Sequence, residues 1–363
     1  VEKKLGITKD AIGKTISVAE YNQTCRKEVM KYTAEWESLT KQMGYWVDME
    51  HPYVTYKNKY IETLWYLLKE LYKKGLLYKG LSIQPYSPAA GTGLSSHELN
   101  QPGCYRDVKD TVCTAQFRII DAPESLRGRG ESFFLAWTTT PWTLPSNTAL
   151  CVGPSIEYCT VETFNPYSAM PITVVLATAL LGSYFDAESE VSELPETWDK
   201  ETYKKAPWHR LSTCKGSDLV GIHYEQLIPW VNPGEGAFRV IPGDYVSTED
   251  GTGIVHIAPT FGADDERVAK AAGVPPLLMI DNKGQQRPMV DLKGRFYKIE
   301  ALDHQFLKES VNVPLYDTYA GRYVKKDYDP KDTPDKETLD VDICVMLKHE
   351  NRVFRVEKHT HNY

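Results

Sequence analysis

Residues 137–147 read WTTTPWTLPSN, and this stretch decides how the rest of the chain is interpreted. Two prolines fix φ at about −65° within a segment that is crowded with hydrogen-bonding groups. An isolated Thr-Thr-Thr is usually part of an edge strand, because β-branched residues suit a pleated surface. The complete stretch is typical of neither an alternating strand nor an ordinary loop, so it is a candidate functional segment. Its polar side chains are those of Thr138, Thr139, Thr140, Thr143 and Asn147.

Composition sets broad limits on the protein. The chain has 363 residues, enough for two or three domains, and its 42% hydrophobic and 25% charged residues are ordinary for a globular protein. No apolar run approaches the roughly 20 residues of a membrane span, and residues 1–13 lack the apolar core of a signal peptide. Seven cysteines without a C-x-x-C pair indicate reduced thiols. We therefore expect a cytoplasmic protein with no membrane partner.

The net charge of −7 argues against a surface that is basic all over, but it does not exclude nucleic acid. Contacts with phosphates need only a local basic stripe. Such stripes are more often solvated faces than binding sites. The candidates are Lys57–Lys59, Lys69–Lys79, Lys325–Lys326 and Lys348–Lys358.

Helical periodicity dominates the first 80 residues. Apolar residues recur every three or four positions over 20–43, which predicts one amphipathic helix with Ser17 near its start and Gly44 just past its end. A second such helix is predicted over 58–74, and Gly75 ends it. We expect the aromatic stripes of both helices to lie in a core.

From about residue 113 the period changes to two, which predicts many short strands and few helices. We expect a mixed α/β, mainly β fold: a β-barrel domain over 113–320 with an insertion near 183–218, a helical stalk over 1–112 and a return linker over 321–363. The predicted strands cover 113–120, 132–137, 149–152, 158–163, 172–177, 238–241, 253–257 and 277–280. The predicted helices cover 264–272, 303–312 and 337–349, and a strand-like VFRVEK follows.

A second motif, GTGIVHIAPTFGADDE, covers residues 251–266. Taken alone, His256 is a strand histidine, and Asp264 and Asp265 are acidic residues at a helix start, where the helix dipole favours them. The motif lacks the third glycine of a dinucleotide-binding loop. It also lacks a histidine or cysteine at metal-ligand spacing, so we predict no metal site.

Together the two motifs resemble the editing domain of the class I tRNA synthetases for isoleucine, valine and leucine. The resemblance covers essentially the whole chain, and residues 44–80 and 85–98 are most similar to the isoleucyl branch. Some relatives bind zinc near here through cysteines, but this chain has Pro-Ala-Ala-Gly at 88–91, which predicts no metal there. The ATP-binding signatures of the family are absent, so ATP and Mg²⁺ are expected only for a catalytic domain outside this sequence. We expect an excised piece of a longer chain, and a monomeric full-length enzyme.

The resemblance implies a function and a set of site residues. A pocket shaped for isoleucine favours isoleucine over valine by a free energy of only about 1–3 kcal/mol. This is a general value, and this enzyme family is its standard example. A second pocket would then hydrolyse mischarged valyl-tRNA(Ile), with the tRNA 3′ end and misactivated valine as partners. The implied catalytic residues are Thr138, Thr139, Thr140, His256 and Asp265, and the implied substrate-binding residues are Trp142, Thr143, Asn147 and Asp265.

Within that resemblance, Asp265 would hold the α-ammonium, and the threonine wall would set the pocket size and place water. His256 would orient the terminal ribose or stabilise the oxyanion; whether it also acts as a general base stays open at this point. We expect the helix dipole to keep Asp265 ionised. Two alternatives remain: an editing domain for valine or leucine, and a non-catalytic tRNA-docking module.

Overall fold

The computed structural model describes residues 1–328 and 338–362. The chain forms two compact units, Val1–Gly80 and Leu81–Tyr363, which are described separately. Part of the proline-containing segment that we expected to be a linker lies outside the described residues. In the described part of the chain, no helix is long and apolar enough to cross a membrane.

The first unit is helical, but the long helix expected over 20–43 is two helices. Ser17 caps the first by accepting a hydrogen bond from the Glu20 N–H. The Thr33 hydroxyl donates to the Met30 carbonyl at 2.9 Å, and this local side-chain bond competes with the helical ladder where the helix breaks. The helix predicted over 58–74 is confirmed. The helices are α1 (Glu2–Leu5), α2 (Val18–Val29), α3 (Thr33–Gln42) and α4 (Asn58–Lys73).

The apolar stripes of these helices are not a core within this unit. Trp36 is 68% exposed and Trp65 is 69% exposed, and none of the residues of α1–α4 is buried. The expectation of an aromatic core was therefore wrong for the described residues. An amphipathic period determines which face of a helix is apolar, but not what covers that face.

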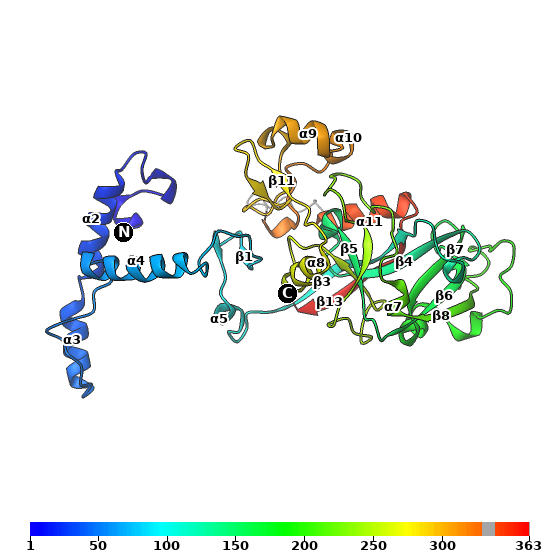
Figure 1. The fold of residues 1–363 in the computed structure, drawn as a ribbon, viewed down its shortest axis with the longest axis horizontal. Coiled ribbons are helices and arrows are strands. Elements are labelled where there is room, and N and C mark those ends of the chain that lie inside the picture. The colour runs from blue at the N-terminus through cyan, green and yellow to red at the C-terminus, as the bar shows by residue number, and fades with distance from the viewer. Residues whose placement is uncertain (329–337, 363) are drawn as a thin grey trace. The chain divides into compact units, whose positions relative to one another are not determined.

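A six-stranded sheet is the framework of the second unit (Figure 1). Its order is β13-β3-β4-β7-β6-β8, and all neighbours are antiparallel except the parallel pair β4 and β7. Five of these strands match or overlap predicted ones. The strands are β3 (Asp107–Arg118), β4 (Glu131–Thr138), β6 (Glu157–Phe164), β7 (Pro171–Ala177), β8 (His209–Lys215) and β13 (Val353–Asn362).

A three-stranded sheet, in the order β10-β5-β9, packs against it and confirms three further predicted strands. Buried side chains of both sheets, such as Phe117, Phe134 and Leu150, belong to one core cluster. Among the described residues β13 and β8 are free edges of the large sheet, so the mainly β class is confirmed but no closed barrel is observed. The strands are β5 (Ala149–Val152), β9 (Arg239–Pro242) and β10 (Ile254–Ile257).

Two segments contribute more than was expected of them. The stretch 183–218 contains β8, an edge strand whose mostly exposed side chains hide its period. The stretch 321–363 contains the predicted helix and strand, but it is more than a linker, because β13 pairs with β3 along nearly its whole length. The remaining helices of the second unit are α5 (Ser96–Leu99), α6 (Leu181–Tyr184), α7 (Gly216–Leu219), α8 (Ala263–Ala272), α9 (His304–Ser310), α10 (Val313–Tyr316) and α11 (Leu339–His349). The short strand pairs are β1 (Tyr86–Ser87) with β2 (Thr92–Gly93), and β11 (Met279–Ile280) with β12 (Gln286–Arg287).

Candidate functional site

The threonine-rich segment is the end of β4 followed by a 3-10 helix, η3 (Pro141–Ser146). Pro141 begins this helix, as its fixed φ and missing N–H allow. The Thr138 hydroxyl accepts the Thr140 N–H at 3.0 Å, and the Thr143 hydroxyl donates to the Thr140 carbonyl at 2.8 Å. These two hydroxyls hold the turn itself. The Thr139 and Thr140 hydroxyls, 3.4 Å apart, line the adjacent cavity.

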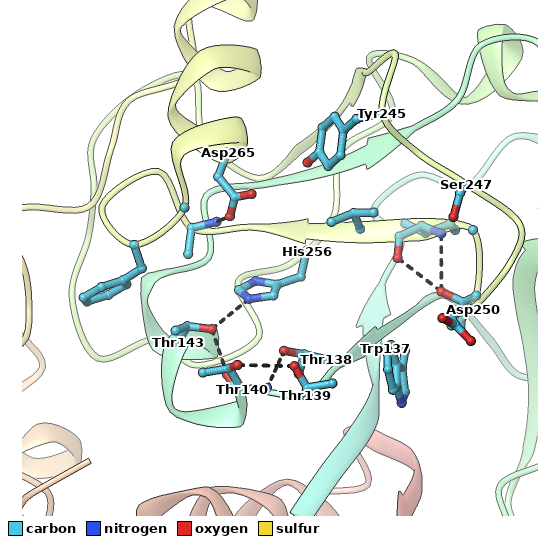
Figure 2. Close-up of a pocket in the computed structure, with 18 of the residues that line it drawn as sticks. Trp137, Thr138, Thr139, Thr140, Thr143, Tyr245, Ser247, Asp250, His256 and Asp265 are labelled. Atoms are coloured by element: carbon cyan, nitrogen blue, oxygen red, sulfur yellow. Dashed lines mark hydrogen bonds between the residues drawn. The ribbon is translucent and has the colours of Figure 1, made fainter. Parts of the chain in front are cut away.

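His256 lies on β10, opposite Leu150 of β5, and its side chain points toward the threonine turn (Figure 2). Its Nε2 is 2.9 Å from the Thr143 hydroxyl, and its Nδ1 is 3.3 Å from the Asn147 amide nitrogen. That amide nitrogen also donates to the Ala149 carbonyl at 2.8 Å, while the amide oxygen accepts from the Tyr224 hydroxyl at 2.6 Å. The reverse amide orientation would bring two oxygens together at Ala149, so the orientation is determined.

This network fixes the tautomer of His256. Because Asn147 donates to Nδ1, the ring proton is on Nε2 and is donated to Thr143. Neither ring nitrogen is then free to take a proton from water. Burial away from solvent also lowers the pKa of His256 to about 4, because a desolvated imidazolium is unfavourable. The ring is a neutral, fixed group that orients Thr143.

The lowered pKa of His256 predicts a pH-dependent contribution to stability. In the unfolded chain the imidazole takes up a proton below about pH 6.5, whereas the folded protein resists protonation down to about pH 4. This contribution is therefore complete above pH 6.5 and is lost as the pH falls toward 4. When the pH is lowered from 7 to 4.5, we expect the free energy of unfolding of His256→Gln to fall by about 2 kcal/mol less than that of the wild type. Urea unfolding at both pH values measures this difference. His304→Gln, at an exposed position, should follow the wild type; equal losses for all three proteins would contradict the assignment.

Asp265 is in the first turn of α8, and its carboxylate accepts the Ala258 N–H at 2.8 Å. Gly262 permits this approach, because a Cβ there would lie 2.7 Å from the carboxylate carbon. Burial raises the pKa of Asp265 to about 6, which is opposite in direction to the effect expected from the helix dipole. Desolvation outweighs the dipole here, so the carboxylate is ionised at neutral pH, and it has no cationic partner among the residues that the structure describes. Such an anion suits a charged amine.

The two motifs meet at one cavity of about 480 Å³, formed by the end of β4, by η3, by β10 and by the start of α8 (Figure 2). Trp142 and Phe261 make an edge-to-face pair at 5.0 Å along its wall. Asn147 is 2% exposed and lies behind His256, outside the residues that line the cavity. The predicted site residues that do line it are Thr138, Thr139, Thr140, Trp142, Thr143, His256 and Asp265.

Four residues of the site region lie outside both motifs and were not predicted. Tyr245, Ser247 and Asp250 line the cavity from the segment before β10, which has no regular period. Asp340, a buried residue of α11, accepts a hydrogen bond from the Trp142 N–H although it is far from Trp142 in the sequence. No local pattern marks any of these positions; only the Gly-flanked start of the second motif could have drawn attention to the nearby segment. Among the described residues, no cluster of three or more histidine, cysteine, aspartate or glutamate side chains could hold a metal ion.

Comparisons with known proteins identify the family of this chain. A family model described as tRNA synthetases class I (I, L, M and V) matches residues 1–326. The Isoleucine--tRNA ligase of Porphyromonas gingivalis is 67% identical over all 363 residues, and that of Clostridium tetani is 38% identical over 326 residues, or 84% of this chain. This chain covers 32% and 28% of those two proteins, so it spans about a third of the length of its relatives.

Two solved structures share parts of the fold at low similarity. One is the crystal structure of GlLeuRS-CP1, with a TM-score of 0.40 and 15% identity, covering 68% of this chain and 99% of that one. The other is the editing domain of the P. knowlesi cytosolic leucyl-tRNA synthetase, with a TM-score of 0.31 and 16% identity, covering 43% of this chain and 60% of that one. Likenesses of this size carry no functional argument. With the family model matching most of the sequence, the chain belongs to the class I tRNA synthetases that include the isoleucine, leucine, methionine and valine enzymes.

Proposed function

We propose that this chain is the editing part of an isoleucine--tRNA ligase and hydrolyses the ester of mischarged valyl-tRNA(Ile). The observation that carries the proposal is the shared cavity between the threonine turn and Asp265, two segments more than 100 residues apart in the sequence. Its lining combines hydroxyls, a neutral histidine and the carboxylate of Asp265, with a second acidic residue, Asp250, contributed by the segment before β10. This set suits an aminoacyl ester, which has a small side chain, a carbonyl to polarise and a protonated amine.

The proposed chemistry needs no protein nucleophile. Asp265 binds the α-ammonium, since the carboxylate has no cationic partner of its own among its hydrogen bonds. The Thr139 and Thr140 hydroxyls place a water molecule at the ester carbonyl. The water oxygen bonds to the carbonyl carbon, the bond from that carbon to the ribose oxygen breaks, and the ribose oxygen takes the proton. His256 holds Thr143 in place and takes no proton itself.

A deacylation assay tests the proposal directly. Mischarged valyl-tRNA(Ile) is incubated with the protein, and release of free valine is compared with the uncatalysed rate. We expect rapid release from valyl-tRNA(Ile) and slow release from isoleucyl-tRNA(Ile). Preferential release from a tRNA mischarged for the valine or leucine enzyme would favour a sister editing domain. Binding of tRNA with no deacylation of any ester would favour a docking module and overturn the proposal.

The size of the pocket is tested at Thr140, which offers a matched pair of substitutions. Thr140→Ser removes only the methyl group, and we expect hydrolysis of isoleucyl-tRNA(Ile) to rise about tenfold, because one methylene is worth about 1–3 kcal/mol. Thr140→Val keeps the volume but removes the hydroxyl, and we expect slower hydrolysis of the valyl ester with unchanged discrimination. For each variant, kcat/KM is measured with valyl-tRNA(Ile) and with isoleucyl-tRNA(Ile). Unchanged discrimination in Thr140→Ser would reject the role of Thr140 in excluding isoleucine.

We also propose the remaining partners. The 3′ end of tRNA(Ile) and misactivated valine are the proposed ligands of this cavity, and the cytoplasm is the proposed compartment. We propose that ATP and Mg²⁺ bind only a catalytic domain outside this sequence, and that the full-length enzyme is a monomer.

A further inference from the structure

The threonine turn depends on a carboxylate from a distant part of the chain. The helix η3 has no side-chain cap from its own N-cap residue, Thr140. The N–H of Trp142, in the first turn of η3, instead donates to Oδ1 of Asp340 at 2.8 Å. Asp340 is at the start of α11 and is 0% exposed. A residue 198 positions away therefore supplies the missing cap.

The Asp340 carboxylate belongs to a buried chain of charges. Its second oxygen pairs with the ammonium of Lys325, which is 5% exposed. The same ammonium is 3.0 Å from Asp110 of β3, and Asp110 is 3.2 Å from Nε2 of His361 on the paired strand β13. The chain of charges thus runs from the β3–β13 ribbon to the backbone of the threonine turn.

Such a network calls for a reason other than stability. Removing two charges from water can cost as much free energy as their attraction returns, so a buried ion pair is weak evidence for stability, and in some proteins such a pair fixes a particular conformation instead. Here the positioned group is the Trp142 amide. The Trp142 ring lines the cavity, and the next residue, Thr143, holds His256. A shift of this amide would displace both.

We propose that Asp340 is a positioning residue of the editing pocket: it fixes the Trp142 amide and thereby sets the shape of the threonine turn. The inference rests on the proposed function only for its effect on deacylation. The structural part stands on the contact between Asp340 and the turn, and it is measurable without any substrate.

Three variants isolate the contact. Asp340→Ala removes the cap, and Asp340→Asn keeps an oxygen that can accept the Trp142 N–H. Asp342→Ala is the matched control, because Asp342 is on the same helix but pairs with Arg322 at a partly exposed position. If Asp340→Ala does not fold, the double variant Asp340→Ala/Lys325→Met removes the cap without leaving the lysine unpaired at Asp340. All variants are made in the full 363-residue chain.

The first measurement is hydrogen exchange of the Trp142 amide in protein labelled with ¹⁵N-tryptophan, assigned with Trp142→Phe. We expect exchange at least about tenfold faster in Asp340→Ala, or in the double variant, than in the wild type and Asp342→Ala, with Asp340→Asn close to the wild type. Equal protection in all variants would overturn the proposal, whether or not the protein deacylates tRNA.

The second measurement is deacylation of valyl-tRNA(Ile) by the same variants. We expect kcat/KM to fall about tenfold in Asp340→Ala, with restoration to within about threefold by asparagine. A merely destabilising change would not be rescued in this way. Equal kcat/KM in Asp340→Ala and wild type would overturn the proposed effect on the pocket. No deacylation by the wild type would instead contradict the proposed function, and the exchange result would still decide the positioning role.

Discussion

Asp265→Asn is expected to abolish most deacylation while making the protein more stable at pH 8. The asparagine oxygen can still accept the Ala258 N–H, but it cannot pair with an ammonium. Losing one partner of a partly buried ion pair costs about 3–5 kcal/mol, so kcat/KM for valyl-tRNA(Ile) should fall at least about 100-fold. The same change removes a desolvated charge from the folded protein in the absence of substrate.

The sign of the stability change follows from the pKa. Burial raises the pKa of Asp265 to about 6, against about 3.9 in the unfolded chain. The proton bound to this carboxyl group stabilises the folded state at low pH, and this stabilisation is lost as the pH rises through 6. We therefore expect Asp265→Asn to gain about 2 kcal/mol over the wild type at pH 8, and the gain to shrink toward pH 4, in urea unfolding at both pH values.

Asp264→Asn is the matched control for Asp265→Asn. Asp264 is the adjacent residue, but it is exposed and pairs with Arg267 at 3.3 Å. Its substitution should leave deacylation within about threefold of the wild type, because an exposed ion pair contributes little. Wild-type activity in Asp265→Asn, or an equal loss in both variants, would remove Asp265 from the substrate site.

Asn147→Ala is expected to cause a large loss of stability. The side chain is buried and satisfies three groups: the Ala149 carbonyl, Nδ1 of His256 and the Tyr224 hydroxyl. Each buried polar group left without a partner costs about 1–3 kcal/mol, and relaxation of the structure recovers part of this cost. We therefore expect the free energy of unfolding to fall by about 3 kcal/mol. Urea unfolding at pH 7.5 measures it. Deacylation should fall as well, because Nδ1 is no longer held and Thr143 loses its fixed donor.

Tyr224→Phe removes one hydroxyl from the same network and serves as the comparison. The phenylalanine ring keeps the edge contacts of Tyr224 with Phe117 and Phe238, and one lost hydrogen bond costs about 1 kcal/mol. A loss in Asn147→Ala no greater than that in Tyr224→Phe would contradict the role of Asn147 as the centre of the network.

The strands of the second unit could be predicted because their sequence periods are local. Residues 149–152 alternate little but are uniformly apolar, and they form the buried strand β5 as expected. The edge strand β8 was not predicted, since its exposed side chains give little apolar signal. The break between α2 and α3 was not predicted either, because the stripe of apolar residues continues across it while one threonine side chain competes for a backbone carbonyl.

The site was only partly predictable from the sequence. The two motifs identified seven of the lining residues, because each motif is short and continuous. Tyr245 and Asp340 could not be found in this way, since the first is in an irregular segment and the second reaches the turn through tertiary contact alone.

The amino-acid sequence by itself determined the mainly β class, the two motifs and the chemical groups that they bring. Only the tertiary structure decided how these groups are used. It showed that Asn147 supports His256, that His256 is neutral with both nitrogens engaged, and that burial raises the pKa of Asp265. The physical reason is that desolvation and hydrogen-bond direction depend on what surrounds a side chain in space, and neighbours in space are contributed by segments that are remote in the sequence.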